Sequence, residues 1–180
     1  MAIHHAELSL CKDRRQRRRL NATPQNTHVA AGLNTEDRIT IEVIMQSFKI
    51  TVDTTPEAAE KAVREALSVE GFGVITEIDM AATFKAKLDF DRPPLKILGA
   101  CNPDFARAAL EFDPSIAFLL PCNVVIEQTS EGVTVSTADP RDLINDPALD
   151  ELVTDVANRV ERALNSVKAH FASTTSKNNG

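Results

Sequence analysis

Two junctions with the same local chemistry constrain the fold of this chain more than any other feature. At each of them a polar side chain is followed directly by proline, as Thr55-Pro56 and as Asn102-Pro103. This pair is typical of a helix start, because the polar side chain accepts a hydrogen bond from a free backbone N–H and proline tolerates the first helical position. Each junction follows an apolar segment typical of a strand, at residues 48–52 and 95–100. We therefore expect two strand-to-helix units in succession.

The remaining segments complete this pattern. Further strands are predicted at 72–80, 116–128 and 133–137, and a weaker helical segment at 81–88. The order β-α-β-(α)-β-α-β-β-α predicts an α+β fold, with a mixed, mostly antiparallel sheet of about five strands and helices packed on one face. The last helix carries a regular apolar stripe, formed by Leu149, Leu152, Val153, Val156, Val160, Ala163, Leu164 and Val167.

Residues 1–44 differ in composition from the rest. They are predicted to be a disordered basic and polar extension, or a segment that is not natively translated if synthesis starts at Met45. Mass spectrometry of the native N-terminus distinguishes these two alternatives. We expect residues 45–170 to form a single α+β domain and residues 171–180 a disordered tail.

Charge narrows the classes of partner. Residues 1–44 hold seven Lys and Arg against five Asp and Glu, whereas the remainder holds 13 against 21. Because the folded part is acidic, it should repel phosphate backbones. Contact with nucleic acid is therefore expected only through the block of Arg14, Arg15, Arg17, Arg18 and Arg19.

The same composition bears on location. No apolar run reaches the roughly 18 residues that predict a membrane span, and no secretion signal opens the chain. Three Cys in 180 residues do not make a disulfide framework. We expect a cytoplasmic protein without membrane contact.

Two Cys-Asn pairs form the first candidate site. Cys101-Asn102 ends a predicted strand, and Cys122-Asn123 follows Pro121 inside another. If these strands are neighbours, the two thiols could form a reversible disulfide or bind a soft metal such as Cu(I) or Zn. In the alternative interpretation both Cys are small buried side chains, Asn102 caps a helix and Asn123 satisfies backbone groups beside the proline.

Two carboxylates form the second candidate. Glu77 and Asp79 lie two positions apart, on one face of a predicted strand, and Lys85 follows. Paired carboxylates can transfer protons or bind a hard cation, although such a face is more often only solvated. If the two halves of the domain face each other, one pocket would contain Glu77, Asp79, Lys85, Cys101, Asn102, Pro121, Cys122 and Asn123.

Neither candidate forms a complete catalytic arrangement. There is no phosphate-binding Gly loop, and no His occurs between Met45 and Ala169 to activate a Ser or Cys nucleophile. We therefore favour a binding or interaction module over an enzyme, with a pocket near the two Cys-Asn pairs. A sheet edge or helix face could also pair two copies as a homodimer. The alternative is a thiol-based redox or soft-metal protein that uses Cys101 and Cys122; no cofactor can be named.

Three segments in this order also resemble a known family. Gly71–Asp79, Ile97–Pro103 and Leu119–Val125 are similar to the bacterial and archaeal domain-of-unknown-function family 302, over residues 45–168. The resemblance implies a small α+β fold but no reaction, since the biochemical function of that family is not established. It further implies signature positions at Glu77, Asp79, Cys101, Asn102, Pro121, Cys122 and Asn123.

Overall fold

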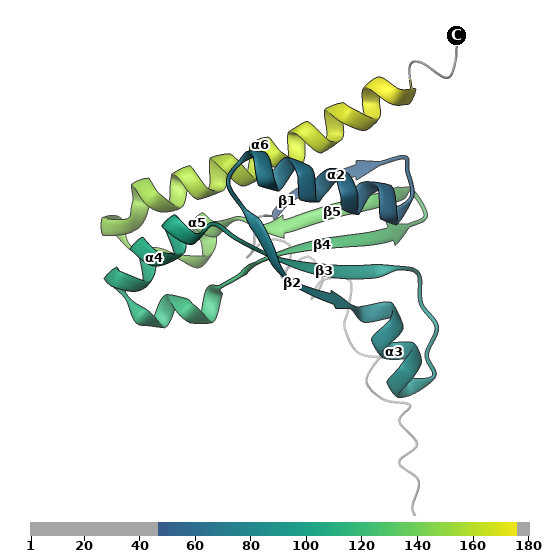
Figure 1. Cartoon of the computed structure of the whole chain (residues 1–180), viewed down its shortest axis with the longest axis horizontal. Coiled ribbons are helices and arrows are strands. Elements are labelled where there is room, and N and C mark those ends of the chain that lie inside the picture. The colour runs from purple at the N-terminus through teal and green to yellow at the C-terminus, as the bar shows by residue number, and fades with distance from the viewer. Residues whose placement is uncertain (1–46, 176–180) are drawn as a thin grey trace, which may run out of the picture. The chain divides into compact units, whose positions relative to one another are not determined.

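The structure is a computed structural model that describes residues 47–175. The strands of this part of the chain form one sheet (Figure 1). The strand order is β1-β5-β4-β3-β2, and every neighbouring pair is antiparallel. The predicted α+β class is thus confirmed. The elements in chain order are β1 (Ser47–Val52), α2 (Pro56–Val69), β2 (Gly73–Asp79), α3 (Met80–Leu88), β3 (Leu95–Cys101), α4 (Pro103–Phe112), the 3-10 helix η2 (Pro114–Leu119), β4 (Cys122–Thr129), β5 (Gly132–Ala138), α5 (Pro140–Leu143), the 3-10 helix η3 (Pro147–Leu149) and α6 (Asp150–Thr175).

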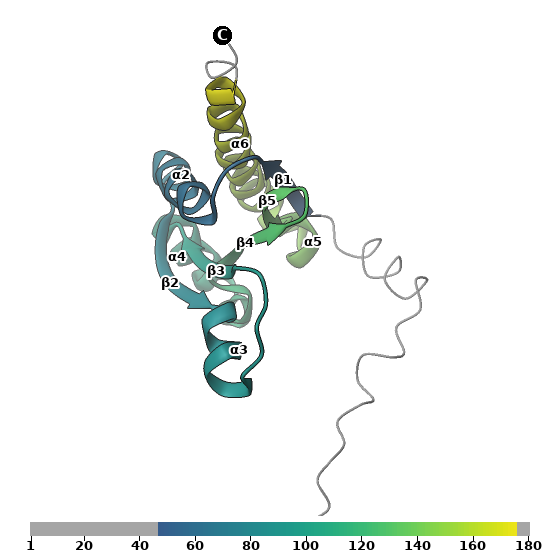
Figure 2. The same cartoon turned by 90° about the vertical axis from the view of Figure 1, so that its right-hand side faces the viewer.

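The main core lies between one face of the sheet and the two helices α2 and α6, which lie on the same side of it (Figures 1 and 2). Period-2 alternation directs one set of strand side chains to this layer, and the apolar stripe of each helix packs against them. Representative buried members are Val63 and Leu67 of α2, Leu98 of β3, Val124 of β4, Val133 and Val135 of β5, and Leu164 of α6.

A second, smaller apolar cluster fills the space where α4, η2 and the start of α6 meet. Its buried members are Ala109, Ile116, Leu149 and Val153. This cluster positions the site described below.

One predicted strand was partly wrong. Residues 116–119 of the segment expected at 116–128 belong to helix η2 (Pro114–Leu119), and the strand begins only at Cys122. The carboxylate of Asp113 accepts a hydrogen bond from the N–H of Ser115 at 2.8 Å, and Pro114 occupies the first helical position. These are the same start signals that begin α4, and they outweigh the apolar run that follows.

The last helix is longer than the sequence analysis predicted. α6 continues to Thr175, beyond residue 170, where the sequence placed the end of the domain. The side chain of Phe171 packs against the core, which explains why the helix continues. The extension predicted for residues 1–44 lies outside the described residues. Within residues 47–175 no helix is long and apolar enough to span a bilayer.

Candidate functional site

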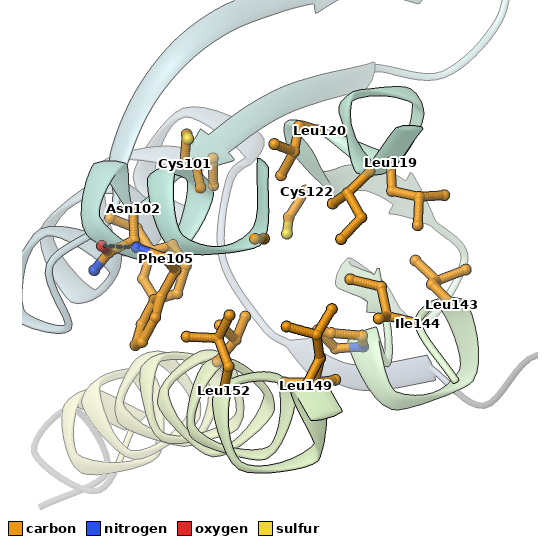
Figure 3. Close-up of a pocket in the computed structure, with 18 residues that line it drawn as sticks. Cys101, Asn102, Phe105, Leu119, Leu120, Cys122, Leu143, Ile144, Leu149 and Leu152 are labelled. Carbon is orange, nitrogen blue, oxygen red and sulfur yellow. Dashed lines mark hydrogen bonds between the residues drawn. The ribbon is translucent and has the colours of Figure 1, made fainter. Parts of the chain in front are cut away.

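A small apolar cavity lies at the end of the sheet where β3 and β4 meet α4, α5 and the start of α6 (Figure 3). Its volume is about 60 Å³. Most of its wall consists of the smaller apolar cluster and neighbouring Leu, Ile and Phe side chains. The polar residues that line it are Cys101, Asn102 and Cys122.

Asn102 helps to shape this wall as a helix cap. Its Oδ1 accepts hydrogen bonds from the backbone N–H groups of Asp104 at 3.1 Å and Phe105 at 3.3 Å. The cap fixes the first turn of α4 and so holds the ring of Phe105 over the cavity, with its centroid 6.5 Å from that of Phe72. The geometry therefore gives Asn102 the capping role of the alternative interpretation.

The two thiols point in different directions. The sheet register pairs Ala100 with Cys122, so Cys122 lies on the same face as the buried Ala100, and Cys101 lies on the other. Figure 3 shows the sulfur of Cys122 directed into the cavity and that of Cys101 directed away from it. Both cysteines are free. This arrangement gives no support to a disulfide between them.

Burial also makes these thiols poor nucleophiles. Burial raises the pKa of Cys101, and both burial and the neighbouring Cys101 raise the pKa of Cys122. The protonated thiol is therefore the form expected at neutral pH, and the nucleophile and metal ligand is the thiolate. Within the described residues, no group of three or more His, Cys, Asp or Glu side chains is arranged to hold a metal ion.

Slow alkylation is the expected result for both thiols. In a Cys11→Ser background, iodoacetamide at pH 7.5 should modify Cys101 and Cys122 more slowly than a free cysteine with pKa about 8.5. The rates should rise steeply only when the pH exceeds the pKa of a free cysteine thiol, about 8.5. Peptide mass spectrometry assigns each modified site. Modification of either residue at neutral pH faster than free cysteine would contradict the buried-thiol interpretation.

Glu77 belongs to a charge network rather than to the cavity. Its carboxylate pairs with Arg64 of α2 and with the Nζ of Lys96 at 2.8 Å, and both cations also pair with Glu60. The hydrogen bond from Lys96 is the main cause that lowers the pKa of Glu77. The network links α2 to β2 and β3.

Asp79 and Lys85 also lie outside the cavity. The Oδ1 of Asp79 accepts a hydrogen bond from the N–H of Ala82 at 2.8 Å and so caps α3. Lys85 pairs with Asp89 and Asp91, at 2.8 Å each, at the far end of that helix. The structure thus does not bring the three charged candidates together with the two Cys-Asn pairs.

Pro121 and Asn123 line a second, more open hollow of about 460 Å³ beside the cavity. The polar residues in its wall are Ser47, Cys122, Asn123, Ser136 and Thr137. The outer hollow and the cavity share five wall residues: Leu119, Leu120, Cys122, Pro140 and Leu143. We call the two hollows together the β4-end site.

Sequence reasoning did not assign to a site the apolar residues that build it, such as Ile116, Leu143 and Leu149. A signal for them was present in three Asp-Pro pairs. Each Asp carboxylate accepts a hydrogen bond from the N–H two positions on and begins a short helical turn. These turns carry Ile116, Leu143 and Leu149 toward the cavity. The pairs are Asp113-Pro114, Asp139-Pro140 and Asp146-Pro147.

Comparisons with known proteins agree with this fold. The sequence model of the family described as Domain of unknown function DUF302 matches residues 48–167. Among solved structures, the crystal structure of an uncharacterized conserved protein DUF302 from Bacillus stearothermophilus is similar, with a TM-score of 0.62 and 29% sequence identity. The similarity covers 67% of this chain and 97% of that chain. No curated protein matches the sequence.

Proposed function

Because this chain belongs to the family Domain of unknown function DUF302, a function must be argued from the site itself, and we propose that the domain binds a small, uncharged, mainly apolar molecule at the β4-end site. One observation carries the proposal. No charged side chain of the described residues lines either the cavity or the outer hollow. Charged residues make up 26% of the sequence, so this region differs sharply from the rest of the chain.

The size of the cavity limits the group that can enter it. An engineered cavity of about 150 Å³ holds a benzene ring. A cavity of about 60 Å³ therefore suits a shorter group, such as a small alkyl end. At about 24 cal/mol per Å³, leaving this volume empty costs roughly 1.4 kcal/mol, which a bound apolar group would recover.

The outer hollow suits the other end of such a molecule. The amide of Asn123 and the hydroxyl of Ser136 can donate and accept hydrogen bonds without carrying charge. An anionic group would find no cation of the described residues in this wall, and the chain as a whole has a net charge of -6. The site therefore favours a neutral head group, such as a hydroxyl or an amide, over a carboxylate or phosphate.

The choice between neutral and anionic ligands gives the test. We expect 1-butanol to perturb backbone NMR signals of residues around the cavity, and to bind at least about 10-fold more tightly than butanoate, a difference of 1.4 kcal/mol or more. Equal affinity for the two compounds, or shifts confined to other parts of the domain, would contradict the proposal.

A cavity-filling substitution provides a second prediction. Ala109 is buried and lines the cavity, whereas Ala108 is exposed on the same helix, α4. Ala109→Leu should weaken 1-butanol binding at least about 10-fold, because the added side chain occupies the cavity. The free energy of unfolding should stay unchanged or rise by up to about 1.4 kcal/mol. Ala108→Leu is the matched control and should bind as the unmodified chain does. Unaltered binding by a folded Ala109→Leu variant would place the ligand elsewhere.

A further inference from the structure

Strand β2 is an exposed edge of the sheet. It is the last strand in the order and pairs with β3 along one side. Six of its seven residues are exposed, and Ile75 and Ile78 keep 63% and 48% of their surface accessible. The other edge strand, β1, instead buries Ile50 and Val52 under the helix layer. An exposed edge with β-branched side chains and open backbone groups is a ready contact for another chain.

Helix α3, which follows β2 directly, is also poorly covered. None of its nine residues is buried. Leu88, its last residue, and Phe90, two positions beyond it, are 69% and 56% exposed. Figures 1 and 2 show α3 projecting from the sheet on the side away from α2 and α6. So short a helix is marginal in water without packing, so a covering surface would stabilise it.

The charges around β2 and α3 are largely balanced within the chain. Glu77 pairs with Arg64 and Lys96. Lys85 pairs with Asp89 and Asp91. A chain with net charge -6 repels its own copy wherever carboxylates are not neutralised, so contact between copies requires such a balanced surface. A nucleic acid or another strongly charged partner would instead require an excess of one sign.

We propose that β2 and α3 form the contact surface through which two copies of this chain pair as a homodimer. We call it the β2–α3 surface, defined by Ile75, Ile78, Leu88 and Phe90. A two-fold axis brings the same edge strand of each copy together in antiparallel orientation, so each supplies backbone partners for the other. The same axis places the exposed apolar side chains of both copies in one contact. This inference does not depend on the ligand of the β4-end site.

Sedimentation velocity on the full chain tests the inference. We expect a species of about twice 19.7 kDa that dissociates on dilution. Ile78→Lys and Leu88→Lys should each raise the dissociation constant at least about 30-fold, because the first puts an unpaired charge on the paired strand and the second puts one on the helical part of the contact. Phe112→Lys is the matched control, since Phe112 is 50% exposed at the end of α4 and outside the surface. It should leave the dimer intact.

Amide hydrogen exchange locates the contact independently. The backbone N–H groups of residues 75–79 that do not bond to β3 should be protected in the dimer and lose that protection in Ile78→Lys, while circular dichroism reports an unchanged fold. A chain that is monomeric at every concentration overturns the inference, as does a dimer that persists in both lysine variants. Dissociation of the Phe112→Lys control to the same extent would also overturn it, because the effect would then not be specific to this surface.

Discussion

Replacement of Gly99 by alanine is expected to destabilise the domain by about 3 kcal/mol or more. A Cβ added at this position would lie 2.1 Å from Thr76 Oγ1 and 2.6 Å from Pro121 Cγ. The Thr hydroxyl can rotate away, but the proline ring is rigid and is held between η2 and β4. The backbone of β3 or β4 must therefore move. This movement also displaces Pro121 from the outer hollow, so ligand binding should weaken together with stability.

Urea unfolding measures this effect, and a second glycine of the sheet provides the matched control. A Cβ on Gly73 in β2 would meet its nearest neighbour, the carbonyl oxygen of Cys101, at 3.9 Å, an ordinary contact. Gly73→Ala should change stability by less than about 1 kcal/mol. Equal losses in the two variants would mean that the close approach of Pro121 to Gly99 does not determine the packing at this end of the sheet.

Asp139→Ala is the second substitution for which we expect a large loss, about 2 kcal/mol. The buried carboxylate of Asp139 caps α5 through the N–H of Arg141 at 2.9 Å. It also receives the guanidinium of Arg141 in a two-point contact, at 2.9 and 2.6 Å. Losing the cap costs about 1 kcal/mol. Losing the charged hydrogen bond adds only a similar amount, because the half-exposed guanidinium of Arg141 can be hydrated instead.

Asp139→Asn separates the two contributions, because asparagine caps a helix as well as aspartate but carries no charge. We expect it to lose about half as much stability as Asp139→Ala in urea unfolding at pH 7. Asp53→Asn, an exposed carboxylate of the β1–α2 loop, is the control and should change stability by less than about 0.5 kcal/mol. Losses of the same size at Asp139 and Asp53 would contradict the role of the ion pair.

The charge contribution at Asp139 should depend on pH in a defined direction. The hydrogen bond from Arg141 is the main cause that lowers the pKa of Asp139 in the folded state. A carboxyl whose pKa is lower when folded than when unfolded stabilises the fold fully above the unfolded value of about 3.9. The difference in stability between the unmodified chain and Asp139→Asn should therefore be constant near neutral pH and shrink as pH falls below about 4. A difference that grows on acidification would refute this assignment.

Local chemistry explains which parts of the fold could be predicted. Thr55-Pro56 and Asn102-Pro103 begin α2 and α4 as expected, and the stripe from Leu149 to Val167 packs on the core. The strand expected from residue 116 was wrong at its start, because Asp113-Pro114 begins a helical turn there. Cap signals adjacent to a proline were therefore more informative in this chain than apolar runs.

The site was less predictable, because it depends on partners distant in sequence. The spacing of Glu77 and Asp79 predicted that the two carboxylates act together. In the structure Glu77 instead forms ion pairs with Arg64 and Lys96, which lie on other elements. Cys101 and Cys122 do lie on neighbouring strands, but only the sheet register reveals that their side chains face opposite sides. The cavity wall comes from five separate segments, at Phe72 and around residues 100–109, 116–122, 140–144 and 149–156, and no spacing within one segment indicates that they converge.

A crystal structure of the domain soaked in 1-butanol tests the proposed binding site most directly. We predict electron density for the alkyl chain inside the cavity, between Phe105, Cys122 and Leu149, with the hydroxyl directed to the outer hollow and Asn123. An empty cavity at saturating alcohol, or alcohol bound only at other surfaces, would contradict the conclusion that the β4-end site receives an uncharged apolar ligand.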